Sequence, residues 1–347
     1  MHGQTKILLR ILLQKNGDKM SSIKLTELFA KARVLRKETR GAEEVGKLGN
    51  LRAGSSGIFS ASGESAGHCL RKAHVRQLGL EIEELAEDKL IMFDLGFASE
   101  DIVVDKLTRA LEGTGKTILC EEDIPIEWRT SNDTKVTGRP DAVIMGVDGK
   151  PELGIELKSV HSIWTARDVL FGGKPKLPNI IQAAHYMWKL NVPYKLVYTG
   201  YSQLGQGMVG TDSWVSRMFP KQGAAMSEYV DYNKDKGTIK HIKQFEIVYD
   251  MRIENSVVEY KPEMSDKWIT TIVNIPDIER FFEKVSAIPS TGDLGPRPSP
   301  VDTLGKKAGY MDCDYCPLKA TCDMHEKSGY SKWLEEVNKF SKVVTGK

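Results

Sequence analysis

Two carboxylates and an ammonium group are the residues of this 347-residue chain whose types and spacing are best suited to chemistry. Asp141 ends a Gly-Arg-Pro-Asp run, and Glu156 and Lys158 belong to a Glu-Leu-Lys run that follows it. Between the two runs lies Asp148-Gly149, a dipeptide typical of a two-residue type I′ hairpin turn. A regular hairpin around that turn places Asp141 opposite Glu156, about 5 Å away, with Lys158 on the same face. Facing carboxylates repel unless a cation lies between them, so the pattern predicts a metal site.

Apolar residues on both strands indicate that this hairpin is central in a sheet. Val143 and Ile144 lie on the first strand, and Leu153, Ile155 and Leu157 alternate with the charged residues of the second. A charged face on a central strand needs a compensating partner. The alternative is an exposed hairpin with scattered charges, and an odd-length loop with a bulge would change the register.

Two predicted helices carry further polar residues that could serve the same site. Glu100 is the only charge on an apolar stripe of a helix predicted at 87–112. It is a natural third ligand for Mg²⁺ or Mn²⁺, although a carboxylate at a stripe edge can also simply reach water. Gln182 and Tyr186 lie four residues apart, on one face of a helix predicted at 178–190. They could hydrogen-bond a phosphate or orient the lysine.

Four of the five cysteines suggest a second metal site. Cys313, Cys316 and Cys322 are closely spaced, and Cys69 is the candidate for a fourth ligand. Cys120 lies in a predicted strand and is expected to be a core thiol. Zinc and an iron–sulfur cluster both accept four thiolates, and the spacing does not separate them.

The elements that must position these residues form an α/β pattern. Further helices are predicted at 66–78, 162–171, 277–287 and 330–342, with an earlier one within 21–60. Strands are predicted at 117–127, 136–145, 152–160, 194–201, 243–250 and 256–261. This order describes a mixed sheet flanked by helices. Residues 202–240 are Gly-rich and irregular, and 289–300 reads as a proline-rich linker.

Composition bounds the partners and the compartment. The net charge of +2 excludes a strong global attraction to polyanions, so a nucleic-acid surface must be local, as in the basic cluster at 31–40. A solvated helix face is the alternative interpretation of that cluster. No apolar stretch is long enough to span a membrane, and the first residues lack a signal-peptide cleavage site. A cytoplasmic protein is expected.

Together, the motifs resemble the RecB-type branch of the PD-(D/E)xK nucleases. They occur in the family's order: Phe93-x2-Gly96-x3-Glu100, Gly138-Arg139-Pro140-Asp141, Glu156-x-Lys158 and Gln182-x3-Tyr186. Cys69-x-Arg71 before them and the three later cysteines resemble the iron–sulfur branch, which includes CRISPR-associated Cas-four exonucleases and phage relatives. Many relatives carry histidine where this chain has Glu100.

The resemblance implies a restriction-endonuclease-like α/β core and defined roles for the site residues. Asp141 and Glu156 would hold Mg²⁺ or Mn²⁺ together with Glu100 and the Leu157 carbonyl, and Lys158 would be the catalytic lysine. Gln182 and Tyr186 would take the place of the family's QxxxY helix. A [4Fe–4S] cluster, with zinc as the alternative, would bind the four cysteines Cys69, Cys313, Cys316 and Cys322.

The function implied is a metal-dependent DNA nuclease, expected to be an exonuclease on single strands or DNA ends in a prokaryotic cell, with a phage origin possible for the gene. One alternative is a nuclease that trims DNA for a partner integrase in CRISPR adaptation. Another is a catalytically idle DNA-binding scaffold. The expected organisation is an N-terminal helix and loop (1–65), a nuclease core (66–200), an insertion with added strands (201–288) and a linker with the C-terminal cysteine segment (289–347).

Overall fold

The computed structural model describes most of the chain from residue 49 onward. The described residues are 49–80, 87–160, 169, 173–200, 230–233, 238–242, 245–308, 313 and 316–345. All of them fall in one compact unit, Gly49–Lys347. The basic cluster predicted at 31–40 and, except for position 169, the helix predicted at 162–171 lie outside them. None of the described helices is long and apolar enough to cross a membrane.

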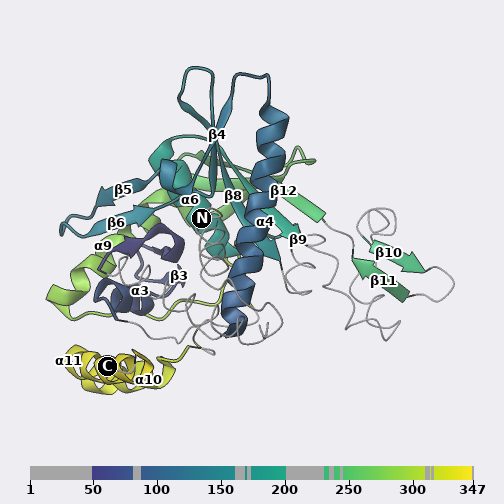
Figure 1. The fold of residues 1–347 in the computed structure, drawn as a ribbon. Coiled ribbons are helices and arrows are strands. Elements are labelled where there is room, and N and C mark those ends of the chain that lie inside the picture. Colours follow the sequence, from purple (N-terminus) through teal and green to yellow (C-terminus); the bar gives the residue numbers. More distant parts are fainter. Residues whose placement is uncertain are drawn as a thin grey trace, which may run out of the picture. The chain divides into compact units, whose positions relative to one another are not determined.

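A seven-stranded mixed sheet forms the centre of this unit (Figure 1). Its strand order is β14 (Ile269–Asn274), β13 (Val257–Pro262), β12 (Phe245–Glu254), β9 (Tyr194–Gly200), β8 (Pro151–Val160), β7 (Ala142–Met145) and β4 (Thr117–Cys120). Only β8 and β9 pair in parallel among these strands, and every other neighbouring pair is antiparallel. The predicted mixed sheet flanked by helices is confirmed.

Two helices cover opposite faces of β8 because its side chains alternate. Ile155 and Leu157 are buried in one hydrophobic cluster with Val103 of α4 (Glu87–Leu111). On the other face, α6 (Leu177–Leu190) packs against β8, β9 and β12. As the parallel pairing requires, α6 lies in the crossover between β8 and β9. The central strands are therefore enclosed on both sides, and polar groups on them are largely dry.

Pro140 divides the strand predicted at 136–145 and places Asp141 just before the second of the two resulting strands. The strand expected at 136–145 is two strands, β6 (Lys135–Gly138) and β7, separated by 139–141. Pro140 has no N–H to give to a sheet ladder, which accounts for the break. The strand expected at 117–127 is also divided, into β4 and β5 (Ile126–Arg129), with a 3₁₀ turn (Glu121–Asp123) between them. β6 then pairs with β5 and β1 (Leu51–Arg52) in a separate three-stranded sheet.

The segments before and after the large sheet differ in several places from the sequence prediction. The helix expected at 66–78 is α3 (Leu70–Gln77), because 65–67 form strand β3 (Ser65–Gly67), paired with β2 (Gly57–Phe59). Part of the 202–240 segment is not irregular, since β10 (Val230–Asn233) and β11 (Thr238–Ile242) pair with each other.

The C-terminal part is more helical than predicted. Helix α9 (Ile275–Thr291) contains Pro289, so the irregular linker starts only at Gly292, whose left-handed backbone ends the helix. After the linker, α10 (Lys319–Ser328), which was not predicted, precedes α11 (Tyr330–Thr345). Both are drawn in yellow in Figure 1.

Candidate active site and cysteine site

The hairpin register agrees with the sequence prediction next to the site. Its ladder pairs there are Ala142–Ile155, Val143–Gly154 and Ile144–Leu153. Continued by one position, this register places Asp141 opposite Glu156. The two carboxyl groups therefore meet where β7 begins, at the end of its pairing with the middle of β8.

The turn, however, is not the predicted type I′ turn. The loop has three residues, 147–149, closed by a hydrogen bond of 2.9 Å from the Gly149 N–H to the Gly146 carbonyl, and Gly149 has a φ of 74°. This is the three-residue form with a left-handed final residue. Met145 then pairs with Pro151 and Ile144 with Leu153, so Glu152 is an extra residue on β8. This bulge compensates for the three-residue loop, so Asp141 still lies opposite Glu156 as predicted. The prediction reached that register by assuming a two-residue turn.

Asp141, Glu156 and Lys158 are in direct contact. The Lys158 ammonium pairs with Glu156 Oε1 and lies 3.8 Å from Asp141 Oδ2. Asp141 Oδ2 also accepts a hydrogen bond of 2.7 Å from the Leu157 N–H. Glu156 is fully buried, and its Oε2 has no hydrogen-bond partner among the described residues. An unpartnered buried carboxylate oxygen is costly and marks a position where a ligand would bind.

Glu100 of α4 reaches this group from the other side of the sheet. Burial and the nearby Asp141 carboxylate raise the pKa of Glu100 to about 8. Burial and Asp141 likewise raise the pKa of Glu156 to about 8, and burial raises that of Asp141. Burial alone would lower the pKa of Lys158, but Glu156 and Asp141 outweigh it and hold this pKa above its ordinary value. Three carboxyl groups thus share one ammonium among the described residues of the site.

Gln182 and Tyr186 lie on α6, over the face of β8 that carries Glu156. The Gln182 amide is 3.5 Å from the Tyr186 hydroxyl, and burial together with Glu156 raises the pKa of Tyr186. A side chain at Gly138 would lie 2.6 Å from the Tyr186 ring. Glycine is therefore required there for the ring to pack against the end of β6.

Tyr194 is a further residue of the site that the sequence did not reveal. Its ring lies directly over Gly154, where an added Cβ would come within 1.8 Å of a ring carbon. Its hydroxyl is buried without a hydrogen-bond partner among the described residues, and burial followed by Glu156 raises its pKa. The only sequence signal is a glycine two residues before Glu156 in a strand, which often marks a close approach.

The donor set fits a hard divalent cation, although the side chains as placed do not form a coordination sphere. No group of three or more His, Cys, Asp or Glu side chains is arranged to hold a metal ion within the part of the chain that the structure describes. Lys158 contacts both Asp141 and Glu156 and takes the position between them. Mg²⁺ and Mn²⁺ favour carboxylate and carbonyl oxygens, and the unpartnered Glu156 Oε2 offers one.

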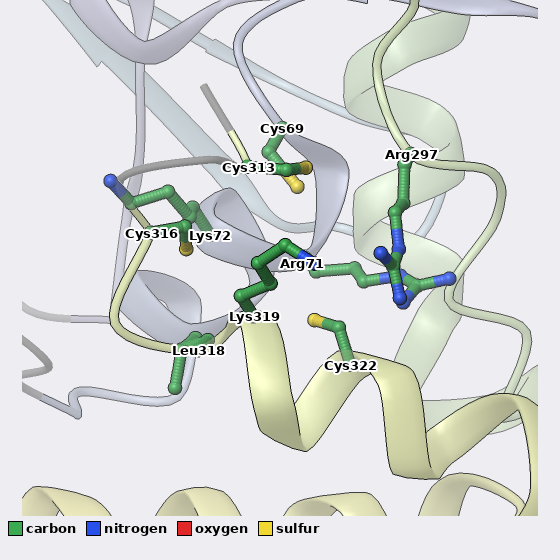
Figure 2. A pocket seen from close by; sticks show the side chains of 9 residues that line it. All are labelled: Cys69, Arg71, Lys72, Arg297, Cys313, Cys316, Leu318, Lys319 and Cys322. Carbon is green, nitrogen blue, oxygen red and sulfur yellow. The ribbon is translucent and has the colours of Figure 1, made fainter. Parts of the chain in front are cut away.

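The four cysteines predicted as metal ligands line one pocket (Figure 2). Cys69 precedes α3, Cys313 and Cys316 lie before α10, and Cys322 lies on α10. Burial raises the pKa of Cys69 to about 11 against the lowering effect of two backbone N–H groups, and Cys322 and Cys313 add to the increase. Cys120 lies apart from them, half-buried on β4.

Packing also holds the cysteine-bearing segments together. Trp333 and Val337 of α11 share a buried cluster with Val75 of α3. The His74 ring lies 2.9 Å from the Tyr330 hydroxyl through Nε2. The C-terminal helices are therefore attached to α3 by an apolar core that lies beside the thiol pocket.

Comparison with known proteins yields little beyond this geometry. No protein-family model matches the chain. No curated protein matches it either. Among solved structures, the chain is similar to an alkaline exonuclease from Laribacter hongkongensis, with a TM-score of 0.28 and 16% identity over 53% of this chain and 89% of that one. A similarity of this strength gives no information on the function of the chain.

The raised carboxyl pKa values predict how the stability of the metal-free protein depends on pH. Glu100 and Glu156 hold protons up to about pH 8 in the folded state, whereas the unfolded chain releases them near the ordinary value of 4.5. The folded state thus binds more protons between these values, and its free energy of unfolding falls as pH rises.

His185 acts in the opposite direction only below its ordinary value of 6.5, because burial lowers its pKa to about 3. Burial also lowers the pKa of Lys189 to about 8, so this residue opposes the carboxyl groups only near the upper end of the window from pH 6.5 to 8. The two carboxyl groups therefore dominate the change across that window. We expect urea denaturation in EDTA to show a loss on the order of 1–3 kcal/mol across that window, which Mg²⁺ reduces. A flat or rising profile would contradict the proton uptake assigned to these two groups.

Proposed function

We propose that this chain is a nuclease that hydrolyses phosphodiester bonds of DNA with Mg²⁺ or Mn²⁺. The observation that carries the proposal is the excess of buried carboxylate over cation at the end of β7. Asp141, Glu156 and Glu100 share Lys158, and one oxygen of Glu156 has no partner among the described residues. Such a surplus disfavours a purely structural role: without a ligand, Glu100 and Glu156 keep protons up to about pH 8, and a bound cation would take the place of those protons.

Each residue has a distinct part in the proposed reaction. Asp141 and Glu156, with Glu100 and the Leu157 carbonyl, would hold the divalent cation. When bound, the cation would polarise the scissile phosphate and lower the pKa of a water molecule. The Asp141 side chain is oriented by the Leu157 N–H, which leaves its other oxygen for the cation.

Lys158 would act as a cation rather than as a base. Without metal, Glu156 and Asp141 hold the pKa of Lys158 above its ordinary value, so the side chain is an ammonium ion in the resting site. Lys158 pairs with Glu156, and with that carboxylate holding the cation, its ammonium group would be available to the substrate. There it would stabilise the charge that develops on the phosphate. Gln182 and Tyr186 would hold the phosphate or the lysine from α6.

The four cysteines are proposed to bind a [4Fe–4S] cluster, with zinc as the alternative occupant. Four sulfurs lining one pocket suit both groups, and the raised pKa of Cys69 means that metal binding must release a proton from its thiol. The cluster would supply a structural link between the start of α3 and the C-terminal segment. Single-stranded DNA or DNA ends are the proposed substrate, and an integrase partner remains a second proposal that the resemblance alone supports.

The test is a time course on end-labelled linear DNA and on circular DNA, single- and double-stranded, with Mg²⁺, Mn²⁺ or EDTA. We expect linear DNA to be degraded from its ends, circular DNA to persist and EDTA to stop the reaction. Asp141→Asn should be inactive, while Asp148→Asn, at the exposed hairpin loop, should match the parent protein. Full metal-dependent cleavage by Asp141→Asn would overturn the site assignment. Absence of cleavage of every substrate by the parent protein would overturn the function.

A further inference from the structure

Arg71, the second residue of α3, is a buried charged residue with few hydrogen-bond partners. Its side chain is 4% exposed, and its Nη2 donates a hydrogen bond of 3.1 Å to the Gly295 carbonyl. Its Nε and Nη1 are buried and have no hydrogen-bond partner among the described residues. A guanidinium carries five N–H donors and cannot lose its charge in a protein. The hydrogen bond to the Gly295 carbonyl therefore satisfies only one of the three guanidinium nitrogens.

The unpartnered edges belong to the thiol pocket. Arg71 lines that pocket with the four cysteines, and Figure 2 shows its side chain extending to the same corner as Arg297, near Cys322. Arg297 also contacts Asp323, so part of its charge is balanced. The other basic residues of the pocket, Lys72 and Lys319, are more accessible to water. Arg71 is thus the charge that most needs an anion inside the pocket.

A metal bound by four thiolates supplies such an anion. Zinc or an oxidised [4Fe–4S] cluster with four cysteine thiolates carries a net charge of about −2, and its sulfurs accept hydrogen bonds. We propose that Arg71 is a positioning residue that serves as the internal counter-charge of this site, with Nε and Nη1 donating to sulfur atoms of the bound group. The inference deepens the cluster assignment made above and depends on metal binding by the four cysteines.

For an iron–sulfur cluster, this counter-charge should raise the reduction potential. Reduction adds negative charge, which a buried guanidinium stabilises, and hydrogen bonds to sulfur act in the same direction. Removing the charge should therefore make the cluster harder to reduce and easier to lose. A purely structural arginine would affect folding without changing the reduction equilibrium.

The experiment compares the parent protein with Arg71→Gln, Arg71→Lys and Arg76→Gln after anaerobic reconstitution with iron and sulfide. Arg76 is a matched control because it is exposed on the same helix and bonds to Ser55. Iron content, absorbance near 400 nm and the midpoint potential are measured. We expect Arg71→Gln to disfavour reduction about tenfold, which is about 59 mV for one electron. Arg71→Lys should fall in between, and Arg76→Gln should match the parent protein.

Each other outcome is decisive. An Arg71→Gln cluster with the parental potential and lifetime overturns the proposal. Failure of Arg71→Gln alone to retain iron, with parental circular dichroism before reconstitution, supports it, whereas loss of that metal-free fold indicates a packing role and overturns it.

If the parent protein takes up no iron, the iron–sulfur assignment fails separately, and Co²⁺ titration tests Arg71. About tenfold weaker formation of the thiolate-to-cobalt absorption by Arg71→Gln then supports the counter-charge. Equal affinity, or no binding by the parent protein, overturns it.

Discussion

Glu156→Gln should abolish DNA cleavage and at the same time stabilise the metal-free protein. Glutamine keeps the shape of the side chain but removes the buried negative charge, so the divalent cation loses a ligand and the reaction loses its main electrostatic support. We expect the rate to fall about a thousandfold or more. Without metal, the substitution relieves repulsion from Asp141 and leaves Lys158 paired with that residue, at 3.8 Å.

Two measurements on the same samples test whether activity is lost while the stability of the metal-free protein increases. Initial rates on end-labelled DNA give the loss of activity, and urea denaturation in EDTA at pH 8 gives a gain on the order of 1 kcal/mol or more. Glu152→Gln is the matched control, because Glu152 lies on the same strand but is exposed and pairs with Lys116. An active Glu156→Gln variant, or one less stable than the parent protein in EDTA at pH 8, would count against a site built for a cation.

Cys322→Ser should weaken the attachment of the C-terminal segment without disturbing the central sheet. The thiol is buried in α10, and its loss removes one of four ligands of the proposed cluster. Structural metal sites contribute folding free energy directly, so we expect the melting temperature to fall by roughly 5–10 °C. The apolar contacts of Trp333 with α3 should retain part of the attachment.

Limited proteolysis and iron analysis distinguish this result from general destabilisation. The variant should lose its iron, and the first proteolytic cut should separate the C-terminal helices α10 and α11 from the rest of the chain. Cys120→Ser is the control, since Cys120 is a half-buried thiol on β4 outside the pocket. Parental iron content and melting temperature in Cys322→Ser would refute the ligand assignment.

Local chemistry and periodicity allowed much of this fold to be predicted. The alternation of charged and apolar residues in β8 identified a strand buried on both faces, and α4 and α6 begin and end close to their expected positions. The three closely spaced cysteines and Cys69 line one pocket, and metal binding by them stays a prediction. These predictions depended on properties that each segment carries by itself.

The errors arose where distant packing decided the outcome. Nothing local indicates that Glu152 is an extra residue in β8, or that Tyr194 lies over Gly154. Strand β14 is an exception, because five of its six residues are β-branched and its composition alone favours a strand. Arg71 could be noted beside Cys69, but its unpartnered N–H groups are visible only once the C-terminal segment is in place.

The bulge at Glu152 makes the tip of the hairpin independent of the active site. The strand pairs next to the loop and those next to the site differ in register by one residue, which is Glu152. Deleting Glu152 would make the ladder regular over its whole length, and Asp141 would still lie opposite Glu156. Deleting one loop residue would leave a two-residue loop between Gly146 and Lys150, and the ladder next to the site would again be unchanged. Chain length can therefore vary at this position during evolution, or in engineered insertions, while the spacing of the two carboxylates is preserved.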